Sequence, residues 1–298
     1  MTSTSSSTPT AARPLHTLKT VLEMVKIEHT LFALPFAFLG MVLAAHGWPA
    51  WSKVFWIVVA MVGARSAAMG WNRLIDRRID AANPRTAGRA LPAGLVSPAA
   101  VSLFIAASAL LLILAAWRLN PLALALSPLA LGILFLYSYT KRFTWAAHLV
   151  LGLSLAGAPL GAWIAIRGDV TAVPLVLAGA VLLWVAGFDI LYALQDLEFD
   201  RQTGLHSIPA RFGVVGSLFL SGGLHAAMLV LLALLPRLYP GLGAGFWVGW
   251  VGCLALLLYQ HWVVRPGDLS RLDAAFFQAN GLLSIWLFAA TALDILLA

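Results

Sequence analysis

Residues 54–71 read "VFWIVVAMVGARSAAMGW" and continue directly into "NRLIDRRIDAANPRT", residues 72–86. The first part is almost wholly apolar and is close to the roughly 20 residues that a transmembrane helix needs. A bilayer core offers the backbone no water to bond, so a segment that crosses it is expected to be helical. The second part alternates acids and bases. The sequence therefore predicts a membrane helix with a strongly charged tip.

The composition of the whole chain agrees with this prediction. Of the 298 residues, 61% are hydrophobic and 10% are charged, whereas an ordinary soluble domain carries about 25% charged residues. Apolar segments recur between breaks that contain Pro, Gly or charge. We therefore predict an all-α, polytopic membrane protein with nine transmembrane helices. The predicted spans are residues 29–47, 53–73, 97–117, 120–138, 145–166, 172–194, 214–236, 242–264 and 275–297.

The N-terminal end differs in character from the rest of the chain. It begins "MTSTSSSTPTAA", which is polar and low in complexity, and we predict a disordered tail over residues 1–18. Residues 19–298 are expected to form the transmembrane domain. A signal peptide is the weaker interpretation, because the first apolar run starts only near Leu31 and further apolar segments follow. The single cysteine, Cys253, lies in an apolar run and is interpreted as an inert core residue.

The positive charges predict an orientation in the membrane. Cytoplasmic loops of membrane proteins carry an excess of Lys and Arg. With nine spans, the N-terminus and the loops after even-numbered helices share a side, and most of the basic residues fall there. The N-terminus is thus predicted to be cytoplasmic and the C-terminus outside. A net charge of +7 could also indicate nucleic-acid binding, but no basic helix or aromatic motif supports it, and no such partner is expected. On the opposite side of the membrane, the predicted loops carry only four basic residues, Lys53, Arg118, Arg167 and Arg237.

Asparagine and aspartate side chains recur every four residues along this charged tip. Asn72, Asp76 and Asp80 lie on one helical face, and Arg65 lies on nearly the same face but deeper in the membrane, where a charge usually faces a partner or a wet cavity. Magnesium commonly takes one or two carboxylates together with substrate phosphates, and arginine binds phosphate oxygens in pairs. The cluster therefore predicts a magnesium–diphosphate site. The alternative is a solvated helix end with ordinary Asp–Arg pairs.

A second acidic cluster lies in "FDILYALQDLEFDRQTGLHSIPARFG", residues 188–213. On a continuous helix Asp189 and Asp196 share a face, Tyr192 lies between them, and Asp200 is one turn further on. Both clusters are followed by a Gly/Pro loop that contains arginine, which predicts two four-helix pseudo-repeats plus a ninth helix. Two acidic stripes that face each other can hold two magnesium ions on one diphosphate and stabilise it as a leaving group.

These motifs, taken in order, resemble the UbiA-type superfamily of membrane aromatic prenyltransferases over about residues 19–297. The family's N-x-x-x-D-x-x-x-D motif is followed here by "RTAGRALPAG", with Ala90 where proline is usual. The stretch "YSYTKRFT", residues 137–144, is similar to the family's third polar patch. The D-x-x-Y-x-x-x-D-x-x-x-D motif comes last. The motif residues are Asn72, Asp76 and Asp80 in the first motif and Asp189, Tyr192, Asp196 and Asp200 in the last.

The resemblance implies a helical bundle around a central cavity, with a cytoplasmic cap, in the cell inner membrane. It implies transfer of a polyprenyl group from polyprenyl diphosphate to an aromatic acceptor, with Mg²⁺ as cofactor and membrane lipid around the protein. Asp189 would orient the acceptor hydroxyl or remove a proton, and Tyr192 would lie near the allylic cation. Arg65 and Lys26 would bind the acceptor carboxylate or the diphosphate. The implied metal ligands are Asn72, Asp76, Asp80, Asp196 and Asp200, and the implied diphosphate contacts are Arg77, Arg85, Lys141 and Arg142.

The acceptor is the least determined of these expectations. The segments "KIEHTLFALPFAF", residues 26–38, and "LQDLEFDRQTGLHSIPARFG", residues 194–213, favour the quinone-pathway branch of the family, with 4-hydroxybenzoate as acceptor. A dihydroxynaphthoate-type acceptor of a menaquinone route is the alternative. A cation-coupled transporter is an alternative of another class, but it would be expected to place its ionisable residues near the bilayer midplane. Here most of the acids lie near one surface.

Overall fold

The computed structural model describes residues 20–21, 30–265, 267, 269, 271–272 and 275–297. Within these ranges the regular elements are all helical, which confirms the predicted fold class. The predicted tail, residues 1–18, lies outside them. The elements are α2 (Thr30–Ala45), α3 (Trp51–Ala82), α4 (Pro98–Leu119), α5 (Pro121–Thr140), α6 (Ala147–Arg167), α7 (Ala172–Tyr192), the 3₁₀-helix η2 (Ala193–Asp196), α8 (Leu197–Thr203), α9 (Ile208–Leu238), α10 (Ala244–Val263), the π-helix η3 (Ala275–Ala279) and α12 (Asn280–Leu297).

Eight helices in the described part of the chain are long and apolar enough to cross a membrane. The apolar part of α2, Ala33–Ala45, is shorter and takes the place of the first predicted span. The 32-residue α3 is about 48 Å long at about 1.5 Å per residue, well beyond a hydrocarbon core of about 30 Å. The run Ala172–Thr203 also has 32 residues. The chain is therefore a multi-pass membrane protein in which two long segments can carry polar tips out of the hydrocarbon region.

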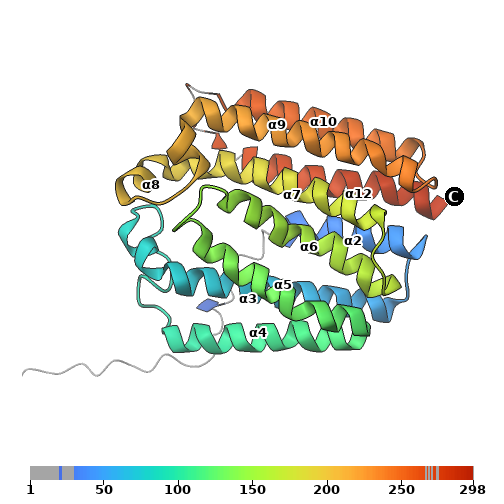
Figure 1. The fold of residues 1–298 in the computed structure, drawn as a ribbon, viewed down its shortest axis with the longest axis horizontal. Coiled ribbons are helices and arrows are strands. Elements are labelled where there is room, and N and C mark those ends of the chain that lie inside the picture. Colours follow the sequence, from blue (N-terminus) through green and yellow to red (C-terminus); the bar gives the residue numbers. More distant parts are fainter. Residues whose placement is uncertain are drawn as a thin grey trace, which may run out of the picture.

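The helices lie side by side, with their axes roughly along the long dimension of the molecule (Figure 1). Helix α7 lies in the middle of the bundle. In its most apolar stretch 67% of the residues are buried, whereas in that of α5 only 17% are. Its Trp184 is fully buried and donates its indole N–H to Asn280 Oδ1 of α12 at 3.0 Å. The same ring lies 5.0 Å from Phe36 of α2. This central helix thus joins the first and last described helices of the bundle.

Small residues bring neighbouring helices close together. A Cβ on Gly40 would lie 2.4 Å from the backbone oxygen of Pro159, and one on Gly152 would lie 2.3 Å from that of Leu182. In a membrane, where lipid tails are as apolar as side chains, such backbone contact is a principal source of helix association. These two glycines fix α6 against α2 on one side and against α7 on the other.

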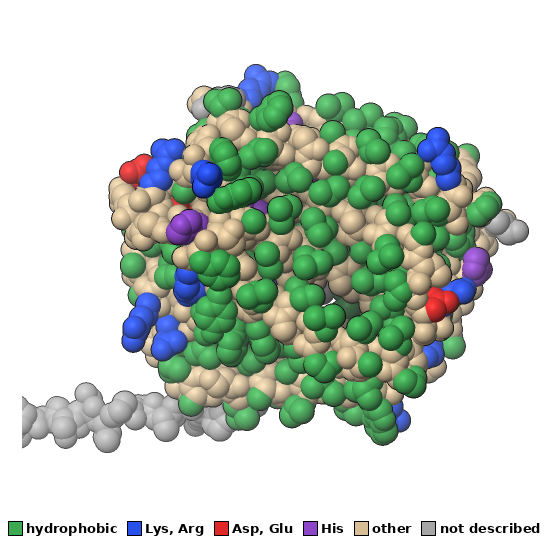
Figure 2. All heavy atoms as spheres, viewed as in Figure 1, with side chains coloured by type: hydrophobic (Ala, Val, Ile, Leu, Met, Phe, Trp, Pro, Cys, Tyr) green, Lys and Arg blue, Asp and Glu red, His purple; other side chains and the backbone are tan. Residues whose placement is uncertain are grey.

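The outer surface is mostly apolar. Hydrophobic side chains are spread over the whole face in Figure 2, and most of the charged side chains lie toward its edges. Some of the largest side chains are strongly exposed, among them Phe219 at 81%. Such exposure is unfavourable in water but favourable against lipid tails. Charged side chains lie at both the left and the right edge of that face (Figure 2), and the left edge is the end of the bundle that carries α8 and the loop after α3 (Figure 1).

Candidate active site

The first acidic cluster lies at the end of one unbroken helix. Because α3 continues to Ala82, Asn72, Asp76 and Asp80 share a face as predicted, and Asn72 Nδ2 donates to Asp76 Oδ2 at 3.0 Å. Asp76 is 2% exposed and Asp80 5%. A buried carboxylate needs charged or hydrogen-bonding partners, and each of these two acids has cationic ones.

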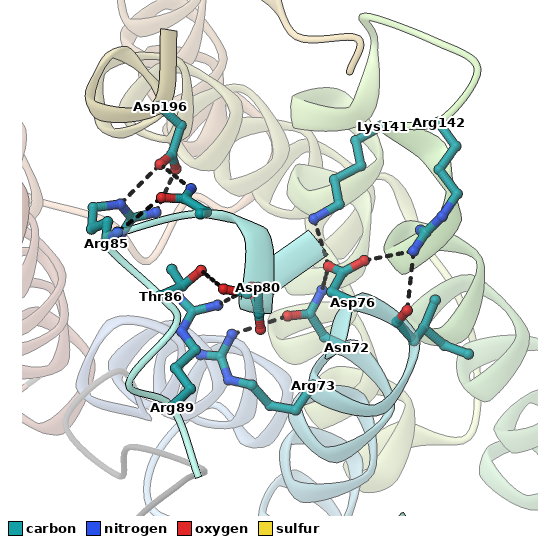
Figure 3. Close-up of polar contacts among 12 residues, drawn as sticks. Asn72, Arg73, Asp76, Asp80, Arg85, Thr86, Arg89, Lys141, Arg142 and Asp196 are labelled. Carbon is teal, nitrogen blue, oxygen red and sulfur yellow. Dashed lines mark hydrogen bonds and ion pairs between the residues drawn. The ribbon is translucent and has the colours of Figure 1, made fainter. Parts of the chain in front are cut away.

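Two cations from the connection after α5 hold Asp76 (Figure 3). Lys141 Nζ lies 2.6 Å from one carboxylate oxygen, and Arg142 Nη2 lies 2.9 Å from the other. Arg142 also donates to the backbone oxygens of Ser138 and Ile75. The third polar patch of the sequence therefore lies directly on the first acidic motif.

Asp80 is held differently. Arg89, from the loop after α3, donates to Asp80 Oδ1 at 2.7 Å, and the Thr86 hydroxyl donates to the Asp80 backbone oxygen at 3.0 Å. The other carboxylate oxygen, Oδ2, is buried without a hydrogen-bond partner. That oxygen has the lone pairs to bind a further ligand.

The same loop reaches across to the second acidic motif. Arg85 donates through Nε to Asp196 Oδ1 at 2.9 Å and pairs through Nη2 with Oδ2, while Asn83 Nδ2 donates to Oδ1 at 2.9 Å (Figure 3). Burial opposes the charge of Arg85, but the hydrogen bond and the negative charge of Asp196 outweigh it and raise the pKa of Arg85. The two motifs thus meet through this loop.

The second motif does not lie on one continuous α-helix, as the prediction assumed. The α-helix ends at Tyr192, a 3₁₀ turn covers Ala193–Asp196, and α8 begins at Leu197. A 3₁₀-helix turns about 120° per residue against about 100° in an α-helix, so four residues shift the register by roughly 80°. Asp189 and Asp196 then lie about 60° apart around the helix axis. Their contacts differ, because Asp189 lies beside His148 while Asp196 lies beside Asn83 and Arg85.

Asp189 contacts a residue that the sequence analysis did not identify. Its Oδ2 lies 2.7 Å from Nδ1 of His148, near the start of α6, and the ring's Nε2 accepts the Ile208 N–H at 3.3 Å. His148 is 4% exposed. The available signal was its place four residues after the third polar patch, on the helix that the patch leads into.

The other two residues of the second motif, Asp200 and Tyr192, each lie near a cation of the site. The Asp200 carboxylate is hydrogen-bonded to the Ser207 side chain and lies in the field of Lys141. The Arg85 guanidinium lies 5.7 Å from the centre of the Tyr192 ring. This distance suits the attraction between a cation and an aromatic face, so the Tyr192 ring already attracts positive charge in this structure.

Three predicted residues are not brought into this network. Arg77 is exposed and donates to the Leu74 backbone oxygen of its own helix at 2.8 Å. Arg65 lies deeper on α3, with its Nε buried and without a hydrogen-bond partner. Lys26 lies outside the described residues. Conversely, Asn83 and Arg89 belong to the network, although the sequence analysis assigned them no role.

The donor atoms fit magnesium in kind. The acids and amides near the two motifs offer only oxygen, the ligand type that this hard cation prefers, and the unbonded Asp80 Oδ2 is one such atom. Among the described residues no three His, Cys, Asp or Glu side chains gather closely enough to hold a metal alone. The unbonded Asp80 oxygen is a carboxylate ligand of the kind that magnesium commonly combines with substrate phosphates. The central cavity and the cytoplasmic cap remain predictions.

Acids on α3, η2 and α8 and cations on two intervening loops lie together at one end of an all-helical integral membrane protein. The chain belongs to the UbiA prenyltransferase family, whose model matches residues 33–288. It is therefore a prenyltransferase of this family.

Relatives and solved structures agree with this assignment. A 4-hydroxybenzoate octaprenyltransferase from Vibrio campbellii is 31% identical over 244 residues, which cover 81% of this chain and 84% of the relative. The apo structure of a UbiA homolog from Aeropyrum pernix K1 is 35% identical, with a TM-score of 0.82 over 91% of this chain and 99% of that one. A UbiA homolog from Archaeoglobus fulgidus, bound to DMAPP and Mg²⁺, shares the fold with a TM-score of 0.74 at 20% identity, over 93% of this chain and 99% of that one.

Proposed function

We propose that this protein transfers a polyprenyl group from polyprenyl diphosphate to 4-hydroxybenzoate in quinone biosynthesis. The observation that carries the proposal is the bridge from Arg85 and Asn83 to Asp196, because it draws both acidic motifs and their cations to one end of the bundle. The named activity of the Vibrio campbellii relative supports the acceptor.

The diphosphate would bind where the cations now hold carboxylates. Arg85, Lys141 and Arg142 would exchange carboxylate oxygens for phosphate oxygens, which their donor groups match equally well. Arg77 stays a candidate for the same role at the exposed edge. Magnesium, when bound, would supply the charge that makes the diphosphate a good leaving group. Its proposed ligands are Asn72, Asp76 and Asp80 for one ion and Asp196 and Asp200 for the other.

In the reaction the bond between the allylic carbon and the diphosphate oxygen breaks, and the ring carbon beside the acceptor hydroxyl bonds to that allylic carbon. The ring then loses a proton. Asp189 would orient the hydroxyl or take this proton, and the face of Tyr192 would stabilise the cation. The buried, unpaired Nε of Arg65 makes that arginine a candidate for the acceptor carboxylate, a role that Lys26 could share.

The experiment uses membranes that contain the protein, one polyprenyl diphosphate and a panel of acceptors. We expect Mg²⁺-dependent release of diphosphate and a prenylated 4-hydroxybenzoate detected by mass spectrometry, both lost with a chelator. Preference for a dihydroxynaphthoate-type acceptor would replace the acceptor with the menaquinone-route alternative. A protein that prenylates no aromatic acceptor would contradict the proposal altogether.

The orientation belongs to the same proposal: an inner-membrane protein with its N-terminus and site in the cytoplasm and its C-terminus outside. A cysteine at Gly88, where a side chain meets open space, should react with an impermeant thiol reagent from the cytoplasmic side only. A cysteine at Val170, exposed in the connection between α6 and α7, should react from the other side. Both are made in a Cys253→Ser background. Labelling of both positions from one side would refute the orientation.

A further inference from the structure

We propose that His148 is a positioning residue that fixes the Asp189 carboxylate for the aromatic acceptor. The proposal rests on the role that the proposed function gives Asp189. Its starting point is a chain of two contacts, from the Ile208 backbone N–H to His148 Nε2 and from His148 Nδ1 to Asp189 Oδ2.

The first contact fixes which ring nitrogen carries the proton. A backbone N–H can only donate, so Nε2 of His148 must accept from Ile208. A neutral imidazole has one donor and one acceptor nitrogen, so the proton lies on Nδ1. That nitrogen then donates to Asp189 Oδ2 across 2.7 Å. Because both nitrogens are engaged and the ring is buried, His148 has one orientation.

The backbone around the ring is itself anchored. Ile208 is the first residue of α9, and Ser207 caps that helix by accepting the Ala210 N–H at 3.2 Å. One residue earlier, the His206 N–H donates to the Lys141 backbone oxygen at 2.8 Å. The connection between α8 and α9 is thus joined to the start of α6 and to the third polar patch. His148 transmits the position of this connection to Asp189.

The contact with His148 engages only one of the two carboxylate oxygens of Asp189. Oδ2 is bonded to His148, while the Asp189 side chain remains 18% exposed, and Oδ1 can meet the acceptor hydroxyl. The ring does not relay a proton in this arrangement, since the lone pair of Nε2 is occupied by the Ile208 N–H. His148 therefore orients the carboxylate. Its loss should affect transfer to the acceptor and leave donor binding unchanged.

Two substitutions of His148 separate positioning from packing. His148→Phe keeps a ring but removes the donor, and we expect a roughly 10- to 100-fold lower kcat, the usual effect of losing a partner that orients a functional group. His148→Asn places an amide N–H near the position of Nδ1 and should restore most of the kcat. The affinities for Mg²⁺ and prenyl diphosphate should stay within about twofold of those of the unsubstituted protein in both variants. A loss of donor binding would instead be about tenfold or more, which corresponds to about 1.4 kcal/mol.

A second pair of variants tests the backbone contact and does not depend on how the ring variants fold. Ile208→Pro removes the N–H at the first position of α9, where proline is well tolerated, and Ile208→Ala is the matched control that keeps it. The Pro variant should show a kcat several-fold lower than the Ala variant, because the tautomer of His148 is no longer fixed.

The outcomes are distinct. A folded His148→Phe protein with unchanged kcat would overturn the inference, and so would equal losses of transfer in the Phe and Asn variants together with lost donor binding, since His148 would then be purely structural. A protein without substitutions that prenylates no aromatic acceptor would instead overturn the proposed function, before any variant is measured.

Discussion

The two acidic motifs both contain residues four apart in the chain, but they do not have the same structure. The first lies on α3, which runs unbroken past Asp80, so its oxygens form one stripe. The second is divided by the 3₁₀ turn Ala193–Asp196, which places Asp189 beside His148 and Asp196 beside the loop after α3. The unbroken motif is suited to one task, and the divided motif to two.

The largest effect is expected where the two motifs have the same role. Asp76→Asn and Asp196→Asn each remove a charge with little change of shape, and each should lower turnover about 100-fold or more, as with other groups that stabilise transition-state charge. The measurement is diphosphate release with saturating Mg²⁺. Glu198→Gln is the control, because that carboxylate is exposed on α8. Normal turnover in both Asp variants would refute a shared metal role.

The next effect distinguishes the two halves of the divided motif. Asp189→Asn should leave Mg²⁺-dependent binding of prenyl diphosphate nearly intact while transfer to the acceptor falls strongly. Asp196→Asn should weaken that binding itself, by about tenfold or 1.4 kcal/mol. Donor affinity and transfer rate are measured for both variants at one Mg²⁺ concentration. Equal losses of donor affinity would show that Asp189 belongs to the metal site.

A smaller effect is expected from the bridge between the motifs. Asn83→Ala removes the hydrogen bond to Asp196 without removing a proposed diphosphate contact. One hydrogen bond is worth about 1 kcal/mol, so donor affinity should fall about fivefold. Titration of prenyl diphosphate at fixed Mg²⁺ measures it. An unchanged affinity would mean that Arg85 alone holds the motifs together.

The smallest effect concerns stability near the break in the second motif. Gly204 ends α8 with φ +69°, a left-handed conformation that costs other residues roughly 1–2 kcal/mol. Gly204→Ala should therefore lower the thermal unfolding midpoint in detergent by a few degrees. Gly88→Ala, at a position with open space and no such φ, should not. Similar midpoints for the two variants would contradict the requirement for this turn.

Features with a strong local cause could be predicted from the sequence. The apolar runs predicted the spanning helices, because a backbone in hydrocarbon must form its hydrogen bonds within the segment. The spacing of Asn72, Asp76 and Asp80 predicted one face, because α3 is a continuous α-helix over these residues. The approach of Lys141 and Arg142 to Asp76 was foreseen only in part: the residues were assigned to one site, but with phosphate as their partner.

Features with a tertiary cause could not be predicted. The segment "YALQDLE", residues 192–198, contains no Pro or Gly, and its local propensity favours a continuous helix. The 3₁₀ turn occurs where Asp196 is bonded by Asn83 and Arg85 from more than 100 residues away in the chain, a contact that no local pattern encodes. His148 was missed for the same reason, because its partner, Asp189, lies on another helix.

The pairing of Asp76 with Lys141 and Arg142 has a consequence for the order in which ligands can enter. A metal ion alone would meet acids already neutralised, and a diphosphate alone would meet cations already occupied. Only when both arrive does every separated charge regain an opposite one, so the two should bind with positive cooperativity. By thermodynamic linkage, the factor by which Mg²⁺ raises the affinity for diphosphate must equal the factor by which diphosphate raises the affinity for Mg²⁺. The ion pairs of the unliganded protein would therefore disfavour binding of either ligand alone and favour binding of the two together.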